Sequence, residues 1–380
     1  MNQPQLDPQR QKQAKIYARL SRRLMAIDLS LTALYTLAWL ALGWAGSLKS
    51  ALQRFTSSEW LLVLAVPGVF AAIFFLIDLP LSYTSGFVLP HRFGQSNETL
   101  KGWVVDLLKG MAIEIPLSAI LLEIIYAVLR AAPQTWWLWT GGILLLFTVV
   151  LANLGPVLIA PLFNKYVPLG EEHAELATRL TRLAEGAGVK VQGVFTFDIS
   201  RRTKSANAAL TGLGGTRRII LGDTLISEFT PDEIETVMAH ELGHQVNKDI
   251  PLGIVLQTAL TLGGLFLAHL GLQAGVAAFG YRGPSDIAAF PLLLVVFGAY
   301  GLVTMPLGNA FSRWRERRAD LYALRTTHNG AALASAFTRL ANQNLADADP
   351  EPWVEFLLYS HPALSKRIAA AQKGSDSRPT

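Results

Sequence analysis

The stretch Val237-Met238-Ala239-His240-Glu241-Leu242-Gly243-His244-Gln245 contains the pattern H-E-x-x-H. On an α-helix, residues four positions apart lie on the same face, so the imidazoles of His240 and His244 can share one zinc ion. The glutamate between them, Glu241, is then placed to activate a water molecule beside that ion. The pattern therefore predicts one zinc ion per chain and hydrolytic chemistry at it.

The residues before this stretch predict where its helix begins. Thr230 is a favourable N-cap residue, and Pro231 suits the first helical position. Asp232 and Glu233 follow in the first turn, where the helix dipole favours negative charge. Farther along, apolar residues recur with helical spacing and predict a buried helix: Ile234, Val237, Met238 and Leu242.

The composition is that of a membrane protein. The chain has 380 residues, of which 51% are hydrophobic and 16% are charged, whereas a soluble domain has about 25% charged residues. Because the chain has no cysteine, a metal ion must be held by histidine and carboxylate side chains. We attribute the net charge of +5 to loops of a membrane protein and expect no nucleic-acid partner.

Six apolar segments are long enough to cross a bilayer: 25–45, 60–83, 107–129, 136–163, 251–279 and 287–311. The first has no clear cleavage site after it, so we expect a retained span rather than a signal peptide. The predicted organisation is a basic N-terminus (1–24), a membrane domain of four spans (25–164) and a metallopeptidase domain (165–380). The last contains the other two spans and a C-terminal tail.

The distribution of lysine and arginine predicts the orientation. The N-terminus, the 83–106 loop, the 165–250 segment and the tail are basic, whereas the loops near 46–59, 130–135 and 280–286 carry few positive charges. The basic side is expected in the cytoplasm, together with both termini and the zinc site. We expect an integral protein of a bacterial inner membrane, with the bilayer as a partner.

Acidic residues also occur within the spans. Asp28 and Asp78 lie near span ends, where solvation accounts for them. Glu114 and Glu123 lie deeper and indicate that the third span faces a polar or water-filled interior.

The 165–250 segment has the charge of a water-exposed domain. It predicts an amphipathic helix at 171–186 and strands at 189–199, 204–215 and 218–221. The expected fold is therefore mainly α: a polytopic membrane protein with about six transmembrane helices, carrying a small α+β, zincin-like domain around the H-E-x-x-H helix.

Zinc in a hydrolase needs a third protein ligand. Glu316 and Asp320 are four residues apart in a helical pattern, so both acids share one face. Glu316 is our candidate third ligand, and Asp320 could accept a hydrogen bond from a zinc-ligating imidazole. The alternative for this run is an exposed, charged helix with salt bridges.

Two further segments are candidates for substrate binding and catalysis. His361 and Arg367 could stabilise an oxyanion. The segment 204–212 could be an exposed strand to which an extended peptide adds through main-chain hydrogen bonds. The candidate substrate-binding residues in it are Asn207, Ala208 and Ala209.

These motifs together resemble peptidase family M48, in the branch of CAAX prenyl protease 1 (Ste24-type) enzymes. The resemblance rests on His240-Glu241-Leu242-Gly243-His244, on Glu316 with Ala319-Asp320, on Asn207, on His361-Pro362 with Arg367, and on 87–97 with 107–109. It implies a helical membrane barrel around a water-filled chamber, zinc ligands His240, His244 and Glu316, and Glu241 as the base. Asn207, Asp320, His361 and Arg367 are implied to support them.

The leading functional prediction is a zinc metalloendopeptidase for membrane-associated, lipidated or peptide substrates. One alternative is a chamber or transporter-like protein with a vestigial metal site, although a structural metal site needs no base such as Glu241. Another is a peptidase for soluble substrates that is merely tethered to the membrane. The chain also departs from the eukaryotic relatives, because six spans are predicted where those have seven.

Overall fold

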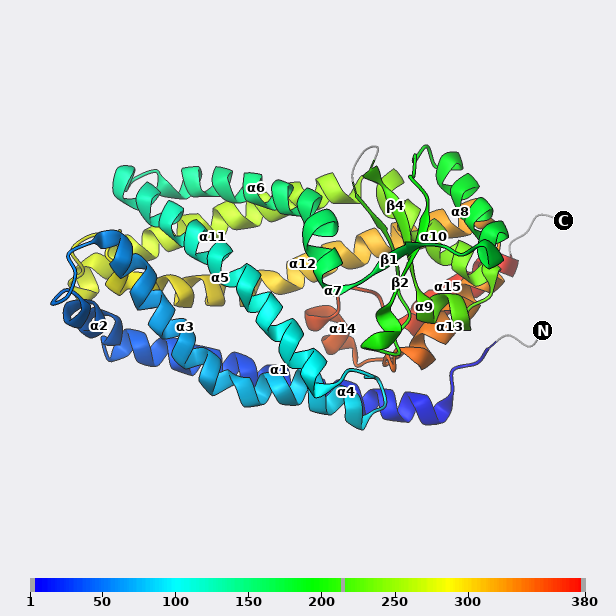
Figure 1. Cartoon of the computed structure of the whole chain (residues 1–380), viewed down its shortest axis with the longest axis horizontal. Helices are drawn as coiled ribbons and strands as arrows, with labels where there is room; N and C mark the ends of the chain where they lie inside the picture. Colours follow the sequence, from blue (N-terminus) through cyan, green and yellow to red (C-terminus); the bar gives the residue numbers. More distant parts are fainter. Residues whose placement is uncertain (1–3, 213–215, 377–380) are drawn as a thin grey trace.

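The computed structural model describes residues 4–212 and 216–376. Figure 1 shows an elongated molecule in which long helices follow the long axis, with a small sheet and several short helices gathered at one end. The chain enters and leaves at this same end. The arrangement matches the predicted fold class, a mainly α membrane protein with a small mixed domain.

In the described part of the chain, six helical segments are long and apolar enough to cross a membrane. The helices in these segments are α1 (Pro8–Ala41), α3 (Glu59–Tyr83), α5 (Leu100–Ala131), α6 (Trp136–Leu154), α11 (Asp249–Phe279) and α12 (Phe290–Thr327). Short elements extend or connect them: α2 (Trp44–Leu52), the π-turns Thr84–Val88 and Gly155–Ile159 that lead into α4 (Leu89–Arg92) and α7 (Ala160–Phe163), and the 3-10 turn Ile287–Ala289. The predicted number of spans is thus confirmed.

Two helices extend well beyond the predicted spans. Helix α1 begins at Pro8 because the Asp7 side chain accepts hydrogen bonds from the amides of Gln9 and Arg10. The basic segment from Pro8 onward is therefore helical and continuous with the first span. Helix α12 continues through the basic run to Thr327, so one helix is both the last span and the carrier of Glu316 and Asp320.

The six long helices form a ring. Helix α1 contacts α3 and α12, α5 contacts α3 and α6, and α11 contacts α6 and α12. A cavity of about 600 Å³ lies among α5, α6, α11 and α12. Its lining is largely apolar and includes Leu122, Tyr126, Trp136, Leu293 and Asn309. Four helices of the ring thus surround a partly open chamber at the depth of the spans.

The outer faces of the spans are apolar. Leu76, Leu146, Val255 and Val303 are 65–78% exposed, although each lies within a long apolar helix. Lipid is the solvent that accommodates such surfaces. Glu123 lines a separate groove with Trp60 rather than the chamber described above, so its position does not show that α5 faces a wet interior.

The domain at the end of the ring is built on a four-stranded sheet. Its order is β1-β2-β4-β3, where β2 and β4 are parallel and the other two pairs are antiparallel. The strands are β1 (Tyr166–Pro168), β2 (Val194–Phe197), β3 (Ala208–Thr211) and β4 (Arg218–Gly222). The helices of this domain are α8 (Ala174–Gly186, after the 3-10 turn Glu171–His173), α9 (Asp223–Glu228), α10 (Pro231–Val246), α13 (Gly330–Gln343), α14 (Pro352–Leu358) and α15 (Leu364–Asp376).

The strand predictions need correction at their boundaries. The predicted strand 189–199 is shortened to Val194–Phe197, because the Val189 amide instead bonds the Ala184 carbonyl at the end of α8. The predicted strand 204–215 contains β3, and its residues 213–215 lie outside the described part. Strand β1 was not predicted, since three residues ending in Pro168 carry little pattern.

Candidate metal centre

Helix α10 begins as its sequence predicts. The Thr230 side chain accepts a hydrogen bond from the Glu233 amide, and the Glu233 carboxylate accepts one from the Thr230 amide. This reciprocal cap satisfies two backbone donors at the helix start. Glu233 also accepts a hydrogen bond from Arg339 Nε of α13 at 2.8 Å. The H-E-x-x-H helix is therefore fixed at its start and packed into the domain, with Met238 and Leu242 fully buried.

A close approach of two helices brings the third candidate ligand to the histidines. A Cβ atom on Gly243 would lie 2.9 Å from Ala319 Cα, so α10 and α12 touch backbone to backbone here. Only glycine permits this separation without a shift of one helix. Ala319 is itself fully buried. Together these two small residues place Glu316, one turn earlier on α12, opposite the two imidazoles.

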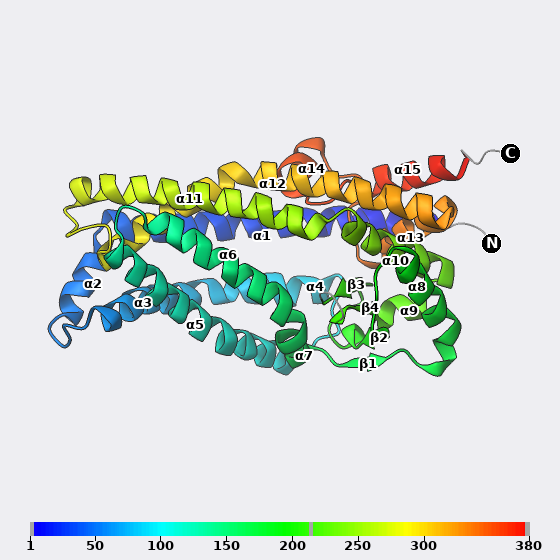
Figure 2. The same cartoon turned by 90° about the horizontal axis from the view of Figure 1, so that it is seen from above.

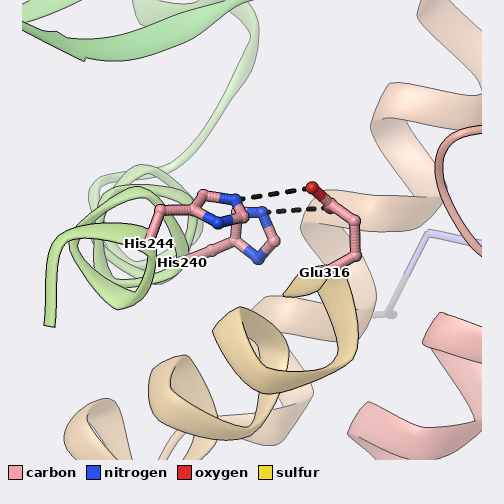
Figure 3. A group of neighbouring side chains, drawn as sticks. All are labelled: His240, His244 and Glu316. Atoms are coloured by element: carbon pink, nitrogen blue, oxygen red, sulfur yellow. Dashed lines mark ion pairs between the residues drawn. The ribbon is translucent and has the colours of Figure 1, made fainter. Parts of the chain in front are cut away.

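The three predicted ligands converge in the structure (Figure 3). His240 Nε2 lies 3.4 Å from Glu316 Oε2, and His244 Nε2 lies 3.4 Å from Glu316 Oε1. One ligand atom from each residue lies within 4.8 Å of the others. Two imidazoles and a carboxylate are the donor set that catalytic zinc takes from proteins, with a further coordination position left for water or substrate.

The burial of Glu316 indicates that the site is built for a cation. Its Oε2 atom is buried and has no hydrogen-bond partner among the described residues. A buried acceptor without a donor is costly unless an ion completes it. The donor set and this unsatisfied oxygen both fit zinc.

Each histidine is oriented by its own carboxylate. His240 Nδ1 lies 2.8 Å from Asp320 Oδ1, and His244 Nδ1 lies 2.8 Å from Asp249 Oδ2. Because a carboxylate only accepts, the Nδ1 atoms carry the protons and both Nε2 lone pairs point to the ion position. Burial opposes protonation of His240, but the neighbouring carboxylates of Asp320 and Glu316 outweigh it and raise the pKa of this imidazole to about 9. Zinc therefore competes with a proton at this imidazole.

Sequence reasoning missed Asp249. It lies five residues after His244 and two residues before the predicted span 251–279, and it is almost fully buried. Lys248 between α10 and α11 has a left-handed backbone (φ 57°), which turns the chain so that Asp249 faces back toward His244. An acid directly before an apolar span was the signal that could have identified it.

Arg367 holds the other carboxylate. Its Nη2 donates to Asp320 Oδ1 at 2.6 Å and its Nε donates to Asp320 Oδ2 at 2.9 Å. The guanidinium also lies over the Phe337 ring, 4.2 Å from its centroid. This two-bond contact is the strong, directional form of arginine–carboxylate pairing. The structure thus places Arg367 against Asp320, whereas the sequence hypothesis gave it an oxyanion.

Glu241 and His361 line a cleft of about 620 Å³ in front of this centre. Burial raises the pKa of Glu241 and lowers the pKa of His361. His361 Nε2 lies 3.5 Å from Glu316 Oε1, and its side chain is 59% exposed. Asn207 and Ala208 lie in the same cleft, at the start of edge strand β3; Ala209 follows in that strand, paired with Ile220. Most of the predicted site residues therefore surround one cavity.

Asp249→Asn is expected to weaken zinc binding about 10–100-fold, since carboxylates that orient a ligand imidazole contribute that much to metal affinity. Asp232→Asn makes the same charge change in the first turn of α10, away from the ion position, and should leave affinity unaltered. Competition with a zinc chelator measures both variants. Equal affinity of Asp249→Asn and the unchanged protein would contradict the role given to Asp249.

The fold and this centre define an integral-membrane metalloprotease. The sequence profile of Peptidase family M48 matches residues 171–375, and that of the CAAX prenyl protease N-terminal domain, described as five membrane helices, matches residues 2–165. The chain belongs to peptidase family M48, whose members are zinc metalloproteases, and carries the membrane domain of its CAAX prenyl protease branch. The described part of 2–165 contains four candidate spans.

Individual relatives agree with this assignment. The chain is 28% identical over 364 residues to the uncharacterized metalloprotease YhfN of Bacillus subtilis, covering 95% of this chain and 85% of that protein. It is 30% identical to CAAX prenyl protease 1 of Saccharomyces cerevisiae, covering 82% and 72%. The crystal structure of S. mikatae Ste24p superposes with a TM-score of 0.86 at 24% identity, covering 96% and 89%, which confirms the fold.

Proposed function

We propose that the chain is a zinc endopeptidase that cleaves extended segments of membrane-associated or lipidated proteins and peptides. One observation carries the proposal: Asn207 and Ala208, at the start of edge strand β3, line the same cleft as Glu241 and His361, directly in front of the histidines. A peptide that adds to β3 by main-chain hydrogen bonds would pass this pair in an extended form. Asn207, Ala208 and Ala209 are the proposed contacts.

Each residue has a proposed role. His240, His244 and Glu316 would hold one zinc ion, which supplies Lewis acidity and lowers the pKa of water when bound. Glu241 would accept a proton from the attacking water and pass it to the leaving amine. His361 would donate a hydrogen bond to the developing oxyanion; its lowered pKa leaves the imidazole neutral near pH 7, with one ring N–H.

The remaining residues would position these groups. Asp320 and Asp249 orient the two imidazoles, and Arg367 holds Asp320 through two hydrogen bonds. Arg367 Nη1 lies 3.6 Å from Glu316 Oε2, so its charge also favours the ionised carboxylate of that ligand. We therefore propose that Arg367 acts through Asp320 and Glu316, and that the oxyanion role belongs to His361.

Comparison of membranes that contain the unchanged protein or Glu241→Gln tests the function. Proteins that are substrates should accumulate uncleaved in the Glu241→Gln membranes, and their new termini should be missing. Terminal-peptide proteomics should be applied to both membranes, which should contain equal amounts of the unchanged protein or of Glu241→Gln. Identical termini in the two membranes would contradict endopeptidase activity.

We further propose that the metal centre and both termini face the cytoplasm of a bacterial cell, as the lysine and arginine distribution predicts. A reporter that is active only outside the inner membrane should be inactive when fused after Thr380. The same reporter inserted in the 280–286 loop, at the opposite end of the spans, should be active. Activity of the fusion after Thr380 would reverse the orientation.

A further inference from the structure

Helix α14 has an apolar face that residues 4–212 and 216–376 leave uncovered. Trp353 is 59% exposed and Phe356 is 57% exposed, whereas Val354 and Glu355 between them are buried. Figure 2 shows α14 on the outside of the helix ring, on the far side of α12 from α3 and α5. Neither Trp353 nor Phe356 lines the chamber among α5, α6, α11 and α12 or belongs to the core packed on the sheet.

Hydrogen bonds fix the position of α14 along the axis of α12. Asn309 Nδ2 donates to the Leu357 carbonyl at 2.6 Å, and Arg313 Nη1 donates to the carbonyls of Glu355 and Tyr359 at 2.9 and 2.6 Å. Arg313 thus satisfies carbonyls at the C-terminal end of α14, where a positive charge is also favoured.

The part of α12 that contacts α14 lies at the end of its apolar region, where the hydrocarbon layer of a membrane would end. From Phe290 to Asn309 the helix contains 20 residues without a charged side chain, which corresponds to roughly 30 Å, the thickness of the hydrocarbon core. Charged residues then begin at Arg313. On the outside of α12 at this level, Leu307 is 56% exposed and Trp314 is 41% exposed.

Two other spans give the same boundary. Arg22 of α1 contacts Glu351, the residue before α14, at 3.4 Å, and the apolar part of α1 begins three residues later, at residue 25. On α11, Arg315 Nη1 lies 3.2 Å from where a Cβ of Gly253 would be, directly after the start of that span. The polar ends of the apolar parts of α1, α11 and α12 therefore lie at one level, and the contacts with Arg22, Asn309 and Arg313 place α14 beside that level.

We infer that α14 is an interfacial membrane anchor, in which Trp353 and Phe356 insert into the lipid leaflet on the side of the metal centre. Tryptophan is favoured at this depth, because its ring lies in the hydrocarbon while the indole N–H meets the headgroups, and phenylalanine is typical of the buried apolar face of an interfacial helix. The partner is the phospholipid bilayer that already surrounds the six spans, so the anchor continues an existing lipid-facing surface.

The anchor is rigidly linked to the cleft. Glu355 Oε1 accepts a hydrogen bond from the Ala363 amide at 3.1 Å, and Oε2 pairs with Lys366 Nζ at 2.5 Å. These two contacts hold the turn 359–363, which connects α14 to α15 and carries His361. Insertion of α14 into the leaflet therefore positions the turn that carries His361. It also holds the opening of the cleft at the membrane surface, where a substrate segment close to its own lipid anchor can reach it.

Depth can be measured directly because the chain has no cysteine. A single Phe356→Cys variant labelled with a fluorophore would be reconstituted in phosphatidylcholine–phosphatidylglycerol vesicles. Leu146→Cys in the middle of α6 and Glu185→Cys at the exposed end of α8 serve as the deep and aqueous controls. We expect acyl-chain nitroxide lipids to quench label 356 at least threefold more than label 185, and aqueous iodide to quench it less.

Equal iodide quenching of labels 356 and 185, or shielding of label 356 from both quenchers, would overturn the anchor; the second result would mean that protein covers this face. The link to the cleft has its own readout. Trp353→Ser with Phe356→Ser should speed amide hydrogen exchange at 359–363 in vesicles and leave exchange in α8 unchanged. Unchanged exchange at 359–363 would overturn the positioning. Neither measurement depends on the proposed cleavage.

Discussion

Glu241→Gln is expected to keep zinc and to lower peptide cleavage on the order of 10²–10⁴-fold, the contribution of a positioned general base. The carboxylate lines the cleft beside the ion position but is not one of the three convergent ligands. The amide of glutamine has nearly the same shape and cannot accept the proton of the attacking water. Ligand geometry therefore stays intact while the proton transfer is lost.

Zinc content and single-turnover cleavage should be measured on the same folded sample. Glu235→Gln is the matched control, because it makes the same change on helix α10 at a residue that pairs with Arg179 outside the cleft. It should cleave at the rate of the unchanged protein. If Glu241 only paired locally, its substitution would change stability and leave the rate per folded molecule alone. Near-normal cleavage by zinc-loaded Glu241→Gln would exclude this mechanism.

The sequence was sufficient where the signal is local. Each span is a long apolar run, and the start of α10 is specified by Thr230 and Glu233. The pairing of His240 with His244 follows from helix periodicity alone. These features depend on residues within one or two helical turns of each other, so no knowledge of the fold was needed to predict them.

Contacts between distant segments were harder to predict. Glu316 reaches the histidines because α10 and α12 approach each other closely. This approach depends on the contact of Gly243 with Ala319, which lies 76 positions later in the chain. Asp249 was missed because its side chain reaches His244 only through the left-handed turn at Lys248. The hydropathy pattern placed Asp249 in the water-exposed segment just before a span, and it gave no information on the direction of the side chain.

Arg367 shows the limit for a long side chain. Its position in the sequence suggested a positively charged side chain near the metal centre, and the structure places the Arg367 guanidinium there. Whether the guanidinium meets a substrate oxygen or Asp320 depends on the geometry of α15 against α12, which no motif encodes. The exposed aromatic face of α14 was likewise invisible, since Trp353 and Phe356 read equally well as the core positions of a short helix.

His240→Ala is expected to remove most of the bound zinc and with it all measurable cleavage. Loss of a direct ligand should cost more than the roughly 10–100-fold in metal affinity that a supporting carboxylate contributes. The remaining His244 and Glu316 would offer two protein atoms where catalytic zinc takes three. The Asp320–Arg367 pair, which holds itself together through two hydrogen bonds, should persist without the imidazole.

Metal analysis after size-exclusion chromatography should give one zinc per unchanged chain and a small fraction of that for His240→Ala. His173→Ala, which removes a partly exposed imidazole at the start of α8, is the control for nonspecific metal loss and should retain full zinc. Stoichiometric zinc in His240→Ala would overturn the ligand assignment. Because α10 is held by its cap at Glu233 and by buried Met238 and Leu242, removing this imidazole should empty the centre without unfolding the helix that carries it.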